Sequence, residues 1–151
     1  EFAVAAGFGL LPVTGAAWIQ YGVFDMQSLL LSIPVSCWVA NILIINELPD
    51  AQADAKANKR TLVVRLGAAM TRRLYLSLNL LAYLSIALAG YLHWISYWSL
   101  LLPTILLLLG IRASQHITPD GDETPLIQQS IQQTLAIHAL GSIWIAAIIW
   151  I

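Results

Sequence analysis

Residues 74–111 read LYLSLNLLAYLSIALAGYLHWISYWSLLLPTILLLLGI, and this uninterrupted apolar run decides the fold. It holds 38 residues without a formal charge, which as one helix at about 1.5 Å per residue would extend roughly 57 Å. The hydrocarbon core of a bilayer is only about 30 Å thick. The segment must therefore fold back, and we expect the break between His93 and Ser99. Two membrane-spanning helices are predicted, over residues 74–94 and 98–111.

The composition of the whole chain identifies the solvent around these helices. Of the 151 residues, 59% are apolar and 10% are charged, whereas an average soluble domain has roughly 25% charged residues. We therefore expect an all-α protein embedded in a lipid bilayer. The formal net charge is only −1 and no basic patch is interleaved with aromatic residues, so no nucleic-acid partner is expected.

Three further apolar runs complete the predicted bundle. They cover residues 2–21, 29–46 and 126–151, the last introduced by Thr124 as a helix cap and Pro125 as the first helical residue. The protein is thus predicted to be multi-pass, with about five membrane spans and one long loop over residues 47–73. Neither an initiator Met nor a basic segment precedes the first run, so we expect no signal peptide and a chain that begins within a longer protein.

The distribution of charge places the long loop on the cytoplasmic side. Six of the seven Lys and Arg residues lie between Lys56 and Arg73, and the seventh is Arg112. With five spans both segments fall on one side of the membrane, which the positive-inside rule makes cytoplasmic. Aromatic residues of the kind that mark an interface are predicted at the opposite side: Trp18, Tyr21, Trp94, Tyr97, Trp98 and Trp150.

The loop begins with the sequence Asn46-Glu-Leu-Pro-Asp50-Ala-Gln-Ala-Asp54. On a helix, Asp50 and Asp54 share one face about a turn apart, where two carboxylates repel unless a cation lies between them. Mg²⁺ prefers oxygen ligands and commonly joins one or two carboxylates to the phosphates of a substrate. Cations that could neutralise the other phosphate oxygens follow directly: Lys56, Lys59, Arg60 and Arg65. The spacing predicts a metal–diphosphate site, and Pro49 is expected to end the preceding helix there.

The motif Asn46-x-x-x-Asp50-x-x-x-Asp54, followed by Lys59-Arg-Thr-Leu-Val-Val-Arg-Leu-Gly67, resembles the second aspartate-rich motif of the UbiA superfamily of intramembrane aromatic prenyltransferases. The amino-acid sequence of this motif is most similar to that of one branch of the superfamily, the 1,4-dihydroxy-2-naphthoate polyprenyltransferases of the menaquinone pathway. The place of the motif among the spans implies the C-terminal half, helices five to nine, of a nine-helix UbiA-type bundle. The family and the cationic loop together imply an inner or plasma membrane location.

This resemblance implies an enzyme that transfers a polyprenyl group from a polyprenyl diphosphate to an aromatic acceptor by Mg²⁺-assisted ionisation. The implied metal ligands are Asp50, Asp54 and Asn46. The implied substrate-binding residues are Asn46, Lys59, Arg60 and Arg65, and the implied catalytic residues are Asp50, Asp54 and Lys59. Arg65 is the weaker candidate, because a basic residue where a helix enters the membrane also satisfies the positive-inside rule.

Two features depart from the family pattern. Family members carry another motif, Asn-Asp-x-x-Asp, in the N-terminal half, and this chain has no such sequence. The missing N-terminal half is therefore an expected partner, and this chain alone is expected to hold half of an active site. The other departure is Asn58, where the family usually has Gly; Asn tolerates a left-handed conformation better than most residues.

Two alternatives outside the enzyme class remain open. A membrane scaffold or assembly partner with the same fold could carry these residues without catalysis. An ion carrier could use the acidic pair for transport, although the pair lies at a membrane edge rather than near the midplane. Within the enzyme class, dihydroxynaphthoate is the best candidate acceptor, and 4-hydroxybenzoate, homogentisate or a tetrapyrrole are the alternatives.

Few polar residues lie inside the predicted spans. Asn79 and His138 are expected to hydrogen-bond across helices. Cys37 is the single cysteine, so no disulfide within the chain is expected.

Overall fold

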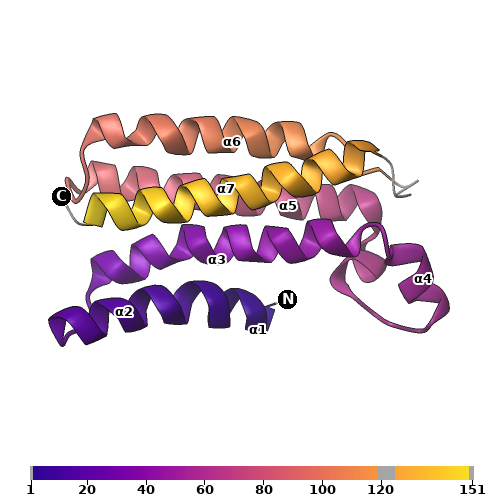
Figure 1. Ribbon diagram of the computed structural model, residues 1–151, viewed down its shortest axis with the longest axis horizontal. Coiled ribbons are helices and arrows are strands. Elements are labelled where there is room, and N and C mark those ends of the chain that lie inside the picture. The colour runs from indigo at the N-terminus through magenta and orange to yellow at the C-terminus, as the bar shows by residue number, and fades with distance from the viewer. Residues whose placement is uncertain (1, 119–124, 150–151) are drawn as a thin grey trace.

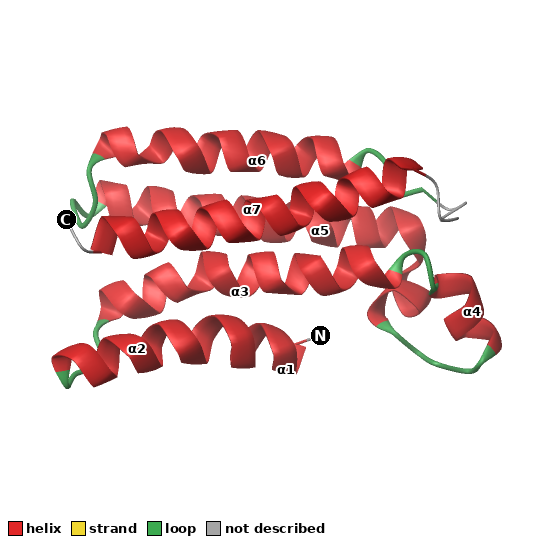
Figure 2. Cartoon of the chain, viewed as in Figure 1, coloured by secondary structure: helices red, strands yellow, loops and turns green. Residues whose placement is uncertain are grey.

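The computed structural model describes residues 2–118 and 125–149, and the regular structure of these residues is entirely helical (Figure 1; Figure 2). The elements are α1 (Phe2–Ala5), the π-helical turn η1 (Ala6–Leu10), α2 (Leu11–Tyr21), α3 (Met26–Glu47), α4 (Ala51–Lys56), α5 (Leu62–Tyr91), the 3-10 turn η2 (Tyr97–Leu100), α6 (Leu101–Ser114) and α7 (Pro125–Ile149). Five helical segments are long and apolar enough to cross a membrane. The prediction of an all-α, multi-pass membrane protein with five spans is confirmed. Thr124 and the last two residues of the predicted fifth span, Trp150 and Ile151, lie outside the described residues.

Helix α3 lies at the centre of the bundle, between α2 and α7 (Figure 1). In its most apolar stretch 67% of the residues are buried, compared with 11% in the first span. Trp38 of α3 belongs to a buried cluster with Ile86 of α5 and Ile137 of α7. The close approach of α7 depends on Gly141, because a Cβ at that position would overlap the Trp38 ring.

The first span changes from one helix type to another near its middle. In the π-helical turn η1, the N–H of Leu11 donates to the carbonyl of Ala6, one residue beyond the usual α-helical partner. Pro12 explains the change, because it has no N–H to donate and its ring crowds the carbonyl four residues before it. The same turn brings Gly9 so close to the backbone of Ser36 in α3 that a Cβ would not fit.

The connections between spans gather at two ends of the bundle (Figure 1). Residues 48–61, which include α4, lie at one end, here called the motif end. Residues 22–25 and 92–96 lie at the other, here called the far end. The far-end turn after α5 falls where the sequence places a break, and His93 adopts a left-handed conformation there (φ 58°). That the motif end faces the cytoplasm remains a prediction.

Helix α5 extends well beyond the charge-free run. It begins at Leu62, whereas the predicted span begins at residue 74, so residues predicted as loop include α4 and the first turns of α5. The difference arises because charged residues stop an apolar run but do not stop a helix; Arg72 and Arg73 continue α5 as exposed residues. Gly67 interrupts these first turns with φ 69° and ψ 166°, a conformation almost confined to glycine.

Candidate functional site

The aspartate motif begins where the central helix α3 ends. α3 stops at Glu47, residues 48–50 form a turn, and α4 starts at Ala51. Pro49 accounts for the stop, because it has no N–H with which to continue the helical hydrogen bonds. Asn46 on the last turn of α3 and Asp50 in the turn are both exposed. The motif therefore leaves the packed bundle at once and lies at its surface.

Asp50 and Asp54 lie one helical turn apart. The N–H of Asp54 donates to the carbonyl oxygen of Asp50 at 2.8 Å, which sets the i and i+4 geometry of the pair. Their surroundings differ, because Asp50 is exposed whereas only 14% of the Asp54 side chain is exposed. One carboxylate thus faces solvent and the other is mostly covered.

The chain turns back on itself after α4 and returns Lys59 to Asp54. Asn58 adopts the left-handed conformation (φ 58°) that the sequence analysis allowed for. Its N–H donates to the Ala55 carbonyl at 3.2 Å, and the N–H of Lys59 donates to the Asp54 carbonyl at 2.9 Å. These two bonds form a Schellman motif, the common end of an α-helix. The Lys59 ammonium then donates to Asp54 Oδ2 at 3.0 Å.

The Lys59–Asp54 contact stabilises the protonated form of Lys59. Its pKa is raised above the usual value, first by the hydrogen bond to Asp54 and then by the attraction of that carboxylate, with smaller contributions from Asp50 and Glu47. Lys59 is therefore protonated throughout the physiological pH range. The ion pair itself was not predicted from the sequence. Lys59 was expected only to bind the diphosphate of the substrate.

The other predicted cations lie around the start of α5. Thr61 caps this helix, and its hydroxyl accepts the N–H of Val64 at 3.3 Å. Arg60 precedes the cap and Arg65 lies on the first turn, and both residues are exposed. The structure therefore brings Lys59 against Asp54, while Arg60 and Arg65 extend the cationic surface of the same end.

Two carboxylates and one amide are the metal ligands that the sequence predicts at this end of the bundle. Within residues 2–118 and 125–149, no three His, Cys, Asp or Glu residues gather into a group that could hold a metal ion. Mg²⁺ typically keeps several waters and uses one or two carboxylates together with substrate phosphates. Asn46, Asp50 and Asp54 fit that shared arrangement better than a closed structural site. Asp54 would have to share or release Lys59 to bind a metal with both oxygens.

An apolar cavity of about 530 Å³ reaches this end of the bundle between α1, η1, α3 and α5. Its lining begins at Leu62, the first residue of α5, and continues along that helix through Leu74 and Leu78 to Leu81. Ile44, close to the end of α3, also lines it. The volume lies within the usual range for small-molecule sites, roughly 300–1,000 Å³. The charged motif and a largely aliphatic cavity therefore meet at Leu62.

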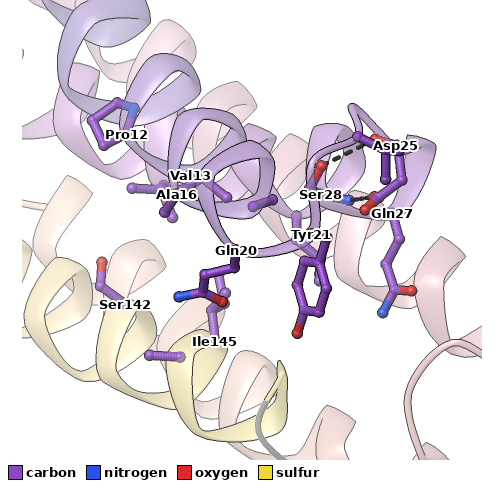
Figure 3. Close-up of a pocket in the computed structure, with 15 residues that line it drawn as sticks. Pro12, Val13, Ala16, Gln20, Tyr21, Asp25, Gln27, Ser28, Ser142 and Ile145 are labelled. Atoms are coloured by element: carbon purple, nitrogen blue, oxygen red, sulfur yellow. Dashed lines mark hydrogen bonds between the residues drawn. The ribbon is translucent and has the colours of Figure 1, made fainter.

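A larger cleft of about 670 Å³ lies between α2, α3 and α7, with its polar residues near the far end (Figure 3). Gln20, Tyr21 and Asp25 contribute to its lining, and the Asp25 carboxylate accepts the N–H of Ser28. Of the described residues that line this cleft, none belongs to the predicted site. Size alone therefore does not identify the functional site, because the carboxylate pair and the cations lie at the other end.

Sequence reasoning missed a set of buried polar residues inside the bundle. Asn41 of α3 donates to the carbonyl of Tyr75 in α5, and the Tyr75 hydroxyl contacts Thr134 of α7. The expectation for Asn79 was wrong, because its amide donates to the Tyr75 carbonyl within its own helix. His138 likewise contacts Ser142 of its own helix, at 3.4 Å. An isolated Asn in an apolar run is the signal that could have identified Asn41.

Comparison with known proteins places these observations in a family. The family model described as "UbiA prenyltransferase family" matches residues 1–131. A 1,4-dihydroxy-2-naphthoate octaprenyltransferase of Haemophilus influenzae is 33% identical over 146 residues, which cover 95% of this chain and 47% of the relative. A protein of the same name from Mycobacterium leprae is 38% identical over 78 residues, covering 52% of this chain and 26% of the relative.

The chain thus spans about half the length of the first of these relatives. No solved structure matches it. The family match extends over most of the chain and includes both the aspartate motif and the cations that follow it. On this evidence the chain belongs to the UbiA prenyltransferase family.

Proposed function

We propose that this chain is part of an enzyme that transfers a polyprenyl group from an allylic diphosphate to an aromatic acceptor. Membership of the family and the names of the relatives support this class of reaction. The same names support dihydroxynaphthoate as the best candidate acceptor and quinone biosynthesis as the setting of the reaction. The observation that carries the proposal is the junction at Leu62, where the charged motif meets the apolar cavity.

The two sides of this junction match the two parts of a polyprenyl diphosphate. Its hydrocarbon chain suits the row of leucines from Leu62 to Leu81, and its diphosphate suits the cations Lys59, Arg60 and Arg65. A substrate that lies across Leu62 would have its charged group at the bundle surface and its chain in the bundle. This arrangement removes apolar surface from water without burying the diphosphate charge.

Each residue of the motif then has a distinct role. Asp50, Asp54 and Asn46 would hold Mg²⁺, which supplies neutralising charge on the diphosphate as the carbon–oxygen bond breaks. Lys59 binds a diphosphate oxygen while its pairing with Asp54 keeps it in place. Arg60 and Arg65 bind further oxygens from the start of α5. The exposure of Asp50 leaves its carboxylate accessible from outside the bundle.

We further propose that the site is completed by an N-terminal half with its own aspartate motif. One carboxylate pair provides few ligands for a diphosphate carrying about three negative charges, and phosphate-transfer sites commonly use two metal ions. The residues 1–151 alone are then expected to bind magnesium and diphosphate weakly and to catalyse no transfer. The motif end would face the cytoplasm of an inner or plasma membrane.

The test is a prenyl-transfer assay with the full-length protein in membranes or detergent. We expect Mg²⁺-dependent formation of a prenylated product from octaprenyl diphosphate and dihydroxynaphthoate, lost on chelation with EDTA and restored by Mg²⁺. Assays with 4-hydroxybenzoate and homogentisate decide the acceptor. Absence of transfer to every aromatic acceptor would favour the scaffold alternative. Robust transfer by residues 1–151 alone would contradict the need for a second half.

A further inference from the structure

A chain of hydrogen bonds crosses the bundle at Tyr75. The Asn41 amide of α3 donates to the Tyr75 carbonyl at 3.2 Å, and the Tyr75 hydroxyl lies 2.7 Å from the Thr134 hydroxyl of α7. Thr134 donates its single proton to the Ser130 carbonyl at 2.8 Å, so Tyr75 must be the donor to Thr134. The Ser130 hydroxyl has one proton and two acceptors, the Ala113 carbonyl of α6 at 3.0 Å and the Leu126 carbonyl of its own helix at 3.2 Å. Four helices are thereby linked, and Tyr75 is fully buried at the centre.

Polar contacts of this kind can fix the register of two packed helices, whereas aliphatic contacts alone specify it poorly. Around this point α3 and α5 meet through aliphatic residues such as Ile44, Ile45 and Leu74. In a bilayer such contacts have no hydrophobic advantage over contacts with lipid. A slip of one helical turn, about 5.4 Å, would replace one aliphatic contact by another. It would, however, remove the Tyr75 carbonyl from Asn41.

The register of α3 against α5 also sets the geometry of the motif. Asp50 follows Asn41 by nine residues and lies in the turn of residues 48–50 that follows α3. Arg65 precedes Tyr75 by ten residues on α5, across the kink at Gly67. The two helices are antiparallel, so the C-terminal end of α3 and the N-terminal end of α5 both lie at the motif end, on the same side of the Asn41–Tyr75 contact (Figure 1). A slip at this contact therefore moves Arg65 relative to Asp50 and Asp54.

The contribution of Asn41 to stability does not by itself explain an asparagine at this position. Only 1% of it is exposed, and its Oδ1 makes no hydrogen bond to any of the described residues. A buried acceptor without a partner is costly, whereas the Tyr75 carbonyl keeps the Asn79 amide as a donor when Asn41 is replaced. Leucine at this position would therefore serve stability at least as well as asparagine. A buried asparagine can instead specify register, as it does in coiled coils.

We propose that Asn41 and Tyr75 are positioning residues, which set the register of α5 against α3 and α7 and so hold Arg65 of α5 in a fixed position relative to Asp50 and Asp54. The positioning itself is a property of the bundle. Its effect on catalysis rests on the prenyl-transfer function proposed above.

The first test measures position without a substrate. In the full-length protein with its native cysteines replaced, spin labels at positions 52 and 69 report the distance between α4 and the start of α5. We expect one narrow distance distribution in the parent protein. In Asn41→Leu and Thr134→Val the distribution should broaden or gain a second peak, displaced by about one helical turn, roughly 5 Å. An unchanged distribution in both variants overturns the proposal.

Matched controls separate register from the loss of a hydroxyl group. Thr104 of α6 makes the same bond to the carbonyl four residues before it as Thr134 does, and within the described chain it makes no bond to another helix. Thr104→Val should therefore leave the distance distribution unchanged. Tyr75→Phe removes the same contact from the other side and should broaden the distribution as Thr134→Val does. Its control is Tyr83→Phe, since the Tyr83 hydroxyl forms no hydrogen bond with the described residues. Broadening in these controls to the same extent would also overturn the proposal.

The second test asks whether position affects the reaction. Asn41→Leu should keep the thermal midpoint of the parent or raise it, while kcat for prenyl transfer falls about tenfold or more because the reacting groups are displaced. A merely structural role would lower both together. If the parent protein transfers no prenyl group, the proposed function fails, and the distance measurement still decides whether Asn41 and Tyr75 set the register. Loss of activity with an unchanged distance distribution counts against positioning.

Discussion

Asp25 and Asp50 each stand at the amino end of a helix, one at the far end of the bundle and one at the motif end. Asp25 has an extended backbone (φ −110°, ψ 159°), and its carboxylate accepts the N–H of Ser28, as expected of a helix cap. Asp50 precedes α4 with a helical backbone (φ −87°, ψ −6°), and within the described residues its carboxylate makes no capping bond. The first carboxylate helps to build a helix, whereas the second contributes nothing of that kind.

The contrast gives a way to test whether a carboxylate serves the fold or, as proposed for Asp50, a ligand. Loss of the Asp25 carboxylate leaves the start of α3 without its cap. Loss of the Asp50 carboxylate breaks no capping bond and removes a negative charge at the surface. Variants of the two aspartates should therefore affect different measurements, and the following predictions test that division from the largest expected effect to the smallest.

The largest effect is expected on catalysis at the motif end. In the full-length protein, Asp50→Asn or Asp54→Asn should reduce prenyl transfer by about a hundredfold or more, because each removes a ligand of the Mg²⁺ that would neutralise the diphosphate as it leaves. The thermal midpoint should stay close to that of the parent. The matched control is Asp25→Asn, which retains a good capping residue and should retain activity. Full activity in either motif variant, measured with saturating Mg²⁺, would remove the basis of the comparison.

A smaller effect is expected for the cation paired with Asp54. Lys59→Ala should weaken the binding of inorganic pyrophosphate with Mg²⁺ about tenfold, equivalent to about 1.4 kcal/mol, because Arg60 and Arg65 remain. Calorimetric titration gives this value directly. Lys59→Arg keeps the charge and should recover most of the affinity.

The pH dependence should not involve Lys59. Its pKa is raised by Asp54, so the ion pair is complete below the pKa of a free lysine and is lost only as the pH rises through the higher folded-state pKa. Activity between pH 6 and pH 9 should therefore change in the same proportion in Lys59→Arg and in the parent. A change of profile confined to the variant would show that Lys59 loses its proton in this range.

A loss of stability is expected at the far end. Asp25→Ala should lower the free energy of unfolding by about 1 kcal/mol, the usual cost of a lost helix cap. Denaturant titration in detergent measures this loss, and Asp25→Asn should show little of it. The kinetic constants of the folded protein should be those of the parent. A catalytic defect in Asp25→Ala at temperatures where it is folded would argue against a purely structural role.

The smallest effect is expected for the turn that returns Lys59 to Asp54. Asn58→Gly should raise stability by less than about 1 kcal/mol, because glycine adopts the left-handed conformation without the cost that a side chain brings. Activity should be unchanged, since the backbone bonds to Ala55 and Asp54 remain. A β-branched residue is the contrasting variant: Asn58→Val should disturb the turn and weaken the Lys59–Asp54 pair.

Sequence and structure agree best where a single physical quantity decides. The length of the charge-free run at 74–111 required two helices, because no single span of that length fits a bilayer. The position of Pro49 likewise located the end of α3. The start of α5 at Leu62 could not be found in this way, because the cations that end the apolar run are compatible with a helix.

The partners of buried side chains were not predictable from spacing. Asn41 and Tyr75 meet only because α3 and α5 pack in one particular register, and neither residue has a local signal for the other. The Lys59–Asp54 pair depends on the backbone of Asn58, which reverses the chain within a few residues. The residues of the motif can be read from the sequence, but which of them pair with one another depends on contacts in the folded chain.

The hydrogen bonds at Tyr75 also impose an order on the synthesis of the chain. The Tyr75 hydroxyl cannot form its hydrogen bond until Thr134 has been synthesised, 59 residues later. At about 5–20 residues per second this interval lasts roughly 3–12 seconds. During that time α3 and α5 can already pair through Asn41, while the hydroxyl faces lipid or the insertion machinery. Insertion of α7 therefore completes the hydrogen bond of the Tyr75 hydroxyl, and a chain that stops before α7 leaves this proton donor exposed to hydrocarbon.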